Sequence, residues 1–325
     1  LHLAAMAAGF QAGDEVIVSS ITFAASSNCV LYCGATPVFA DIRPDTYNIN
    51  PEEIRKLITP KTKGIVAVDF TGQAVEHDEI QKICEENHLI FIEDAAHAIG
   101  TKYKGKPVGS LADMTCFSFH PVKTVTGGEG GAITTNDEKL YHHLLRLRTH
   151  GITRNQEEMV HPTDARWYNE QVELGYNYRM TDFQAALVLS QLHKLGRFSA
   201  RRKEIVKQYD EAFSRMPELL VQREIPESDT TRHLYILRLN PEKLTCDRRQ
   251  FFDALYAENI CAQVHYLPVY WHSYYEKLGY KKGLCPNAEK YYEEVMSIPL
   301  FYSMTDGDVE DVIRAVKKLV AYYRK

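Results

Sequence analysis

The sequence predicts an α/β protein with a mostly parallel central sheet covered by helices on both faces, followed by a smaller C-terminal α+β domain. In the first half, short and wholly apolar runs alternate with helix-like segments, which is the pattern of strands buried on both faces. In the second half, long basic helices replace this alternation. A chain of 325 residues is long enough for two such units. We expect a large domain over residues 1–195 and a small one over residues 196–325.

The elements of the first half follow from local signals. GIVAVDF at 64–70 is apolar throughout and predicts a buried strand, and Pro51 followed by two acidic residues is a typical helix start. The same signals predict strands at 15–18, 36–41, 64–70, 88–95, 114–119 and 131–135, and helices at 23–33, 51–58 and 77–87. The chain opens with LHLAAMAAGF, which reads as the middle of an apolar helix, and it lacks an initial Met. We therefore expect that a preceding segment is missing.

The second half is organised around helices. Residues 181–215 predict long helices, for which Thr181 and Asp182 are the better-placed N-terminal caps. Apolar runs follow at 233–239 and 260–266, with a helix near 247–258 between them and an amphipathic helix over 306–323 at the end. Helices with a few short apolar runs predict a small α+β domain.

Composition and charge exclude several classes of protein. The formal net charge is −5 and no basic block stands out, so we expect no nucleic-acid surface. No apolar stretch approaches the roughly 20 residues that a membrane span needs. The seven cysteines are odd in number and lie mostly in apolar runs, which favours a reduced, cytoplasmic protein. No His and Cys spacing completes a zinc set, so we expect no metal.

Two segments carry reactive residue types. An apolar strand ends in Glu93-Asp94, and an apolar strand is also followed by Lys123 and a glycine-rich loop. Taken singly, Asp94 could cap a helix and Lys123 could be a surface lysine. Taken together, they offer what a carbonyl cofactor requires: a lysine to bind it covalently, small residues to let it approach, and an acid to protonate its pyridine nitrogen. Ligands gather at the carboxyl ends of such strands, so both residues could reach one cleft.

At this point the sequence resembles the DegT/DnrJ/StrS sugar aminotransferases, a family with the aspartate-aminotransferase-like fold of the pyridoxal phosphate (PLP) enzymes of fold type I. The resemblance runs over the whole chain, and several long motifs occur in order. The motifs are ITFAAS (21–26), GATPVFADI (34–42), EDAAHAIG (93–100), SFHPVK (118–123), GEGGAI (128–133), GYNYRMTDFQAA (175–186) and VHYLPVY (264–270).

The resemblance implies a role for each matching residue. Lys123 is expected to bind PLP covalently and then to move a proton between the substrate carbon and the cofactor carbon. Asp94 is expected to pair with the pyridine nitrogen. His97, where many relatives carry Gln, is expected to contact the phenolic oxygen.

Three further residues complete the implied cofactor site. Phe23 is expected to stack on the ring, Ser118 to bind the phosphate, and Asn177 to reach the phosphate in the neighbouring subunit of a homodimer with shared active sites. Each has a plainer interpretation: Phe23 as core, Ser118 as an ordinary strand serine, and Asn177 as a cap of the helix that follows. Glu129 more readily braces the glycine loop than performs chemistry.

One feature of the family is not visible in this sequence. Relatives carry a Ser/Gly/Thr-rich turn just before the helix that corresponds to LHLAAMAAG, and its backbone amides bind the cofactor phosphate. Here the sequence begins after that turn. We therefore expect the chain as given to bind the cofactor weakly, and its full-length parent to be competent.

The signal for the substrate lies in the C-terminal third. Residues 263–283 are dense in aromatic side chains, among which Tyr266 and Tyr270 could stack on a nucleobase or sugar, and His265 could meet a phosphate. A packed connection between domains explains these residues equally well. The stretch YKKGLCPNAEKYYEEVMSIPLFYSMTD is similar to the pseudaminic acid pathway members of the family (PseC type). This similarity implies that L-glutamate aminates C4 of a UDP-linked 2-acetamido-2,6-dideoxy-4-keto-hexose, although dTDP-linked and C3 substrates stay open.

Three other functions fit these residues less well than an aminotransferase does. A PLP-dependent sugar dehydratase of the same fold carries His in place of the lysine, and Lys123 argues against it. A non-catalytic regulatory paralogue would not need the acid, the lysine and the asparagine together. A nicotinamide-dependent oxidoreductase needs GxGxxG between a strand and a helix, whereas GGEGG lies between two strands.

Overall fold

The apolar runs of the first half form one six-stranded sheet in the computed structural model, which describes residues 1–325. Its strand order is β2-β1-β3-β4-β7-β8, and every neighbouring pair is parallel except β7 with β8. The strands are β1 (Glu15–Ser19), β2 (Thr36–Ala40), β3 (Thr62–Val68), β4 (Ile90–Asp94), β7 (Met114–Ser118) and β8 (Gly131–Thr134). The mostly parallel sheet predicted from the sequence is confirmed.

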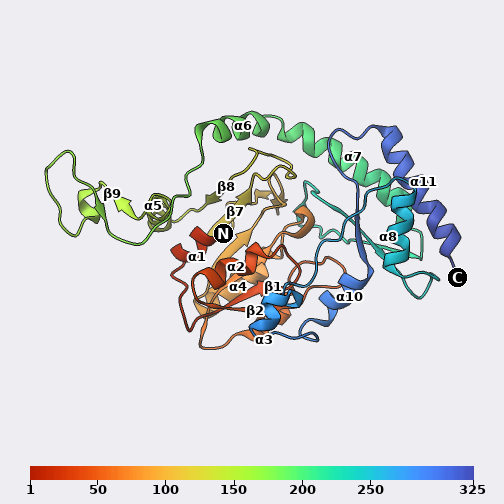
Figure 1. Ribbon diagram of the computed structural model, residues 1–325, viewed down its shortest axis with the longest axis horizontal. Coiled ribbons are helices and arrows are strands. Elements are labelled where there is room, and N and C mark those ends of the chain that lie inside the picture. Colours follow the sequence, from red (N-terminus) through yellow and green to blue (C-terminus); the bar gives the residue numbers. More distant parts are fainter.

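Helices cover both faces of this sheet (Figure 1). Val66 of β3 packs into a cluster with α1 (His2–Ala7), α2 (Ala25–Tyr32) and α5 (Glu138–Leu147). Its neighbours Ile65 and Ala67 pack into the opposite cluster, with α3 (Pro51–Leu57) and α4 (His77–Asn87). Successive side chains of a strand point to opposite faces, so one apolar run supplies both cores.

A long excursion separates the sheet from the second half of the chain. Residues 150–180 carry a short antiparallel pair, β9 (Ile152–Thr153) and β10 (Glu170–Gln171), with η2 (Gln156–Glu158) between them. This arm extends away from the body of the molecule, at the left of Figure 1. The helices α6 (Asp182–Leu192) and α7 (Leu195–Phe213) follow it. Thr181 caps α6 with a full capping box, as the sequence predicted.

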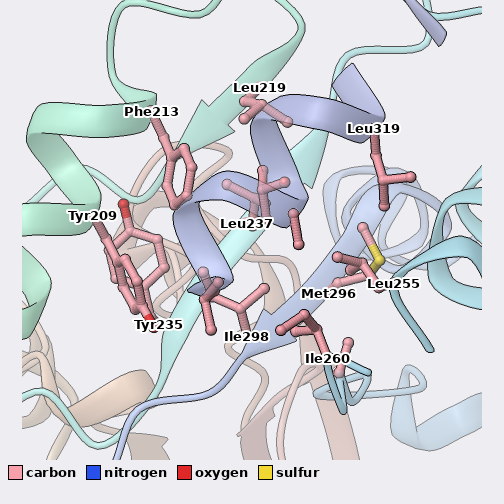
Figure 2. Close-up of a cluster of buried hydrophobic side chains, with 14 of the residues drawn as sticks. Tyr209, Phe213, Leu219, Tyr235, Leu237, Leu255, Ile260, Met296, Ile298 and Leu319 are labelled. Carbon is pink, nitrogen blue, oxygen red and sulfur yellow. The ribbon is translucent and has the colours of Figure 1, made fainter. Parts of the chain in front are cut away.

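The C-terminal part builds a separate apolar core (Figure 2). It packs α7, α8 (Arg248–Ala257) and α11 (Asp306–Tyr323) against a three-stranded antiparallel sheet of β11 (Leu219–Val221), β13 (Tyr235–Leu239) and β14 (Val295–Ile298). The apolar run at 260–266 forms no strand, because only Gln263 bridges to Ser297. None of the helices combines the length and the apolar character that crossing a bilayer requires.

Other C-terminal segments pack on the large sheet instead. In the turn after β3, η1 (Phe70–Gly72) shares an apolar cluster with η3 (Val269–Trp271), α9 (Ser273–Lys277) and α10 (Pro286–Glu294). A small sheet pairs β12 (Ser228–Asp229) with β5 (Lys102–Tyr103), which pairs with β6 (Lys106–Pro107). Residues after 195 therefore contribute to both parts, and the domain boundary at 195/196 stays a prediction.

Candidate active site

The carboxyl ends of the parallel strands hold the first half of the candidate site. Asp94 is the last residue of β4 and is only 5% exposed. Its carboxylate accepts hydrogen bonds from the Ser26 hydroxyl at 2.6 Å and from the Ala96 backbone amide at 3.1 Å. These two donors fix the orientation of this buried carboxylate. Ser26 lies 68 residues away on α2, and no role was predicted for it although it ends the ITFAAS motif.

Lys123 lies in the loop that joins β7 to β8. Backbone bonds close this loop on itself, from Phe119 to Gly130 and from Gly127 back to Phe119. A Cβ atom on Gly127 would lie 2.7 Å from the Val188 side chain, so the tight fit requires glycine there. Burial lowers the pKa of Lys123, and the nearby Asp94 carboxylate offsets part of that effect. A lowered pKa increases the fraction of neutral amine, which is the form of lysine that can attack a carbonyl group or accept a proton.

Three histidines and a tyrosine surround the same lysine. The Tyr266 hydroxyl lies 3.4 Å from Nε2 of His97, and the ring of His233 lies 4.5 Å from the ring of His97. Burial is the main cause that lowers the pKa of each imidazole, and Lys123 adds to it; for His265 the result is about 4. The structure thus brings His97, His265 and Tyr266 together, and adds His233, which sequence reasoning missed.

Phe23 lies at the edge of this group. Its side chain is 66% exposed, although it follows a buried strand, and its ring centroid lies 6.3 Å from that of Tyr266. An exposed aromatic ring that faces buried polar groups is available to stack on a ligand. The alternative interpretation of Phe23 as core is therefore wrong, while its role in cofactor binding stays a prediction.

Ser118 and Asn177 make no hydrogen bond to Lys123 or to the histidines around it. The Ser118 hydroxyl, at the end of β7, accepts a weak hydrogen bond from the His120 amide at 3.4 Å. Asn177 is exposed at the base of the arm, where its backbone bridges to Thr149, and it lines a groove together with Glu129. Within one chain the structure does not bring Asn177 to the lysine, so both phosphate roles remain predictions.

The structure corrects the expectation for Tyr270. This residue is fully buried in the apolar cluster beneath η3, and its hydroxyl donates to Glu289 at 2.7 Å. No part of the side chain is left to contact a substrate. The structural interpretation, a packed connection between segments, is the right one for Tyr270.

A second polar group that the sequence did not reveal lies buried beside Asp94. His77 Nε2 lies 2.6 Å from a Glu93 oxygen, Thr115 donates to Glu93 at 2.7 Å, and Asp69 completes the group within 4.8 Å. Burial and Glu93 raise the pKa of Asp69; burial opposes ionisation of Glu93, but hydrogen bonds from His77, Asp69 and Thr115 outweigh it and lower its pKa. Ligands of one metal ion lie about 3 Å apart or more. The 2.6 Å contact is a direct pairing of His77 with Glu93, too close for two ligands of one ion, and we assign the group to proton sharing.

Comparison with known proteins gives this geometry a context. Residues 1–317 match the model of the DegT/DnrJ/EryC1/StrS aminotransferase family. The spore coat polysaccharide biosynthesis protein SpsC of Bacillus subtilis is 41% identical and covers 98% of this chain, which spans 82% of SpsC. The UDP-4-amino-4,6-dideoxy-N-acetyl-beta-L-altrosamine transaminase of Campylobacter jejuni is 38% identical, with 96% of this chain and 80% of that protein covered.

Solved structures agree with these relatives. Helicobacter pylori PseC, an aminotransferase involved in the biosynthesis of pseudoaminic acid, superposes with a TM-score of 0.90 at 32% identity, over 99% of this chain and 84% of PseC. Spr1654 from Streptococcus pneumoniae, described as a sugar aminotransferase, is known in PLP and PMP forms. Its PLP form superposes with a TM-score of 0.89 at 31% identity, over 99% of this chain and 86% of Spr1654.

Proposed function

The chain belongs to the DegT/DnrJ/EryC1/StrS aminotransferase family, and on this premise we propose that it transfers an amino group from L-glutamate to C4 of a UDP-linked 2-acetamido-2,6-dideoxy-4-keto-hexose. At a coarser level it is a PLP-dependent sugar aminotransferase, because the family, the transaminase relative and the PLP and PMP forms of a structural neighbour agree. The observation that carries the proposal is that the buried Asp94 carboxylate lies near enough to the partly buried Lys123 amine to raise its pKa against the effect of burial.

The residues of the cleft fit PLP. Lys123 is a partly buried amine without a carboxylate within ion-pair distance, Asp94 is an oriented carboxylate, and Phe23 is an unpacked aromatic ring. The Nδ1 atom of buried His97 has no hydrogen-bond partner within the protein, which suits a side chain that meets a ligand. In our proposal Lys123 attaches the cofactor, Asp94 pairs with its pyridine nitrogen, His97 contacts its phenolic oxygen, and Ser118 and the partner protomer's Asn177 hold its phosphate.

The chain's own groups divide the work of amino transfer. PLP, when bound, supplies the electron sink for breaking the C–H bond beside the donor nitrogen. Asp94, held by Ser26 and the Ala96 amide, presents an oriented carboxylate that would pair with the pyridine nitrogen. With the cofactor bound, the Nζ atom of Lys123 would take the proton from the donor carbon and deliver it to the cofactor carbon. Its lowered pKa keeps a neutral amine accessible for this step.

The substrate proposal rests on the relatives and on the wall of the cleft. The Campylobacter jejuni relative and Helicobacter pylori PseC both belong to the chemistry of aminated UDP-linked or pseudoaminic acid sugars, as their names state. In this chain the ring of Tyr266 lies 4.8 Å from that of His265 and 6.3 Å from that of Phe23. An imidazole and a phenol in this place suit the hydroxyl and phosphate groups of a nucleotide sugar. SpsC at 41% identity keeps related polysaccharide precursors open as the second candidate.

We also propose that two copies form a homodimer with shared active sites. Phe183 and Trp167, which lie on α6 and on the arm, are 91% and 83% exposed, and Leu174 is 73% exposed. Large apolar side chains are rarely left in water together unless a partner covers them. Asn177 lies in the same region, so a partner's cleft would receive it. The free state of all seven cysteines supports a cytoplasmic location.

The test is an absorbance titration of the purified protein with added PLP. The lysine-linked cofactor should give a band near the visible edge, and glutamate should replace this band with that of the amine form while 2-oxoglutarate is released. Adding the UDP-4-keto-sugar should then restore the first band. No lysine-linked band would overturn the assignment of Lys123, and a band that no amino acid changes would favour the regulatory paralogue. A band restored only by a C3-keto or dTDP-linked sugar would overturn the substrate.

A further inference from the structure

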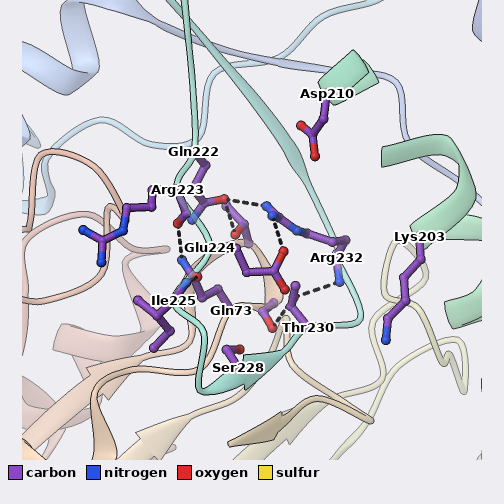
Figure 3. A network of polar contacts seen from close by, with 12 residues as sticks. Gln73, Lys203, Asp210, Gln222, Arg223, Glu224, Ile225, Ser228, Thr230 and Arg232 are labelled. Atoms are coloured by element: carbon purple, nitrogen blue, oxygen red, sulfur yellow. Dashed lines mark hydrogen bonds and ion pairs between the residues drawn. The ribbon is translucent and has the colours of Figure 1, made fainter. Parts of the chain in front are cut away.

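A segment of the C-terminal part packs on the η1 turn that follows β3. We call this segment, residues 222–233 between β11 and β13, the strap. Gln73 fixes it by accepting from the Ile225 amide at 2.7 Å and donating to the Arg223 carbonyl at 3.1 Å. Thr230 donates to the Gly72 carbonyl at 2.7 Å. Figure 3 shows how these side chains converge on one network. The strap is therefore docked on the η1 turn by buried polar contacts, which require specific geometry.

His233, at the end of the strap, is held through its backbone on both sides. Its amide donates to the Thr71 carbonyl at 2.7 Å, and its carbonyl accepts from the buried Arg202 guanidinium at 3.1 Å. Gly72 has φ +98, and a Cβ there would lie 2.9 Å from the His97 carbonyl and 3.1 Å from the His233 amide. The backbones of His97 and His233 thus both lie against Gly72, where a side chain would not fit. This close approach places His233 next to His97.

The two imidazole rings pack directly on each other. Their centroids are 4.5 Å apart with an interplanar angle of 38°, and the residues are 6% and 7% exposed. Neither Nδ1 atom has a hydrogen-bond partner, and neither ring contacts a carboxylate. Around His97 the polar or charged groups are His233, Lys123, His265 and Tyr266. His233 covers the His97 ring from the strap side and lies nearer to it than the rings of Phe70 and Tyr266, at 6.1 and 6.3 Å.

We propose that His233 is a positioning residue for His97: its ring holds the His97 ring in one orientation and shields it from water, so that His97 presents a fixed hydrogen-bonding edge to the ligand in the Lys123 cleft. This role rests on the proposed function, in which His97 meets the cofactor. A donor fixed before the ligand arrives strengthens binding because little ordering remains to be done. Arg202 supports His233 in turn, since one guanidinium joins α7 to the His233 and Leu300 carbonyls.

The first experiment measures the pKa of His97 by NMR of the cofactor-free protein with labelled histidines, assigned with the His97→Gln variant. His233→Ala should raise the pKa of His97 by about one unit or more, because burial and the neighbouring imidazole both lower it now. His233→Gln lacks the flat ring and should shift it in the same direction, which keeps the test open should His233→Ala not fold. His233→Phe keeps the flat cover and should restore most of the depression.

Leu255→Ala is the matched control, because it removes a fully buried side chain of the C-terminal core far from the strap. It should destabilise the fold and leave the pKa of His97 unchanged. With PLP bound, His233→Ala should shift the pH midpoint of the cofactor absorbance and weaken PLP binding, and Leu255→Ala should do neither. An unchanged pKa of His97 in both His233→Ala and His233→Gln overturns the proposal, as does a His233→Phe that behaves like His233→Ala. The NMR measurement needs no turnover, so its failure is distinct from failure of the proposed function.

Discussion

The Lys123 cleft and the C-terminal core differ in how completely their groups are satisfied. The core contains 24 buried apolar residues, and its tyrosines find acceptors: Tyr209 donates to the Pro299 carbonyl and Tyr235 to Asp210, each at 2.8 Å. The cleft instead buries imidazoles with unpartnered nitrogens beside an amine with a lowered pKa, and leaves Phe23 exposed. Natural folds tolerate unsatisfied groups mainly where a ligand completes them. The difference teaches that the core supplies stability and the cleft supplies chemistry.

The largest effect on activity should come from replacing Lys123. Lys123→Ala should reduce amino transfer by more than about a thousandfold, because the attachment point and the proton acceptor are lost together. Thermal stability should change little, since Lys123 makes no ion pair. Lys139→Ala on the exposed surface of α5 is the control and should retain full activity. Turnover is measured by 2-oxoglutarate release; retained turnover in Lys123→Ala would contradict the division between core and cleft.

Two phenylalanine variants, one in the C-terminal core and one beside Lys123, test whether stability and PLP binding depend on different regions. Phe251→Ala, in the fully buried interior of α8, should lower the free energy of unfolding by about 3–5 kcal/mol through the cavity that it leaves. Phe23→Ala should change that free energy by less than about 0.5 kcal/mol, because its ring is exposed. The affinity for PLP should respond in the opposite way, with a loss of roughly tenfold for Phe23→Ala alone. Denaturant unfolding and PLP titration measure the two quantities.

The buried group of Asp69, His77 and Glu93 should differ from both the C-terminal core and the Lys123 site, because its contribution to stability depends on pH. Glu93→Gln removes the ion that His77 and Thr115 hold, and should destabilise the protein by about 3 kcal/mol at neutral pH. The folded-state pKa of Glu93 is lowered, so its contribution exists above the unfolded pKa and is lost as the pH falls through the folded pKa. The gap between wild type and Glu93→Gln should therefore narrow in acid.

Asp69→Asn should show the opposite dependence of stability on pH. Burial and Glu93 raise the folded-state pKa of Asp69, so its favourable contribution exists below the unfolded pKa and is lost as the pH rises through the folded pKa. Asparagine keeps a neutral donor for Glu93 and an acceptor for the Val75 amide. Its stability relative to wild type should thus increase with pH, on the order of 1 kcal/mol per unit of pKa difference. Unfolding curves from pH 5 to 8 decide the point; parallel pH profiles for the two variants would break the assignment of a shared proton.

How much the sequence predicted depends on how local each signal was. The helix over 306–323 coincides with α11, and the six apolar runs coincide with the large sheet, because capping and periodicity are properties of neighbouring residues. Asp94 and Lys123 could be proposed since both follow strands that end at one edge. Ser26 and His233 could not, because each reaches the cleft through a contact between segments distant in the chain. Tyr270 failed for the same reason: aromatic density does not tell a buried ring from an exposed one.

The smallest expected effect belongs to the outer edge of the C-terminal core, where a local signal sets local stability. Thr305 caps α11 by accepting from the Asp308 amide at 3.1 Å, and the Asp308 carboxylate accepts from the Thr305 amide and hydroxyl at 2.8 and 2.7 Å. Thr305→Ala should lower the free energy of unfolding by about 1 kcal/mol. Thr305→Ser keeps the oxygen and should stay near wild type. Neither should alter PLP affinity, because α11 packs only on the apolar core; a cap variant that weakened PLP binding would show that the two regions are coupled.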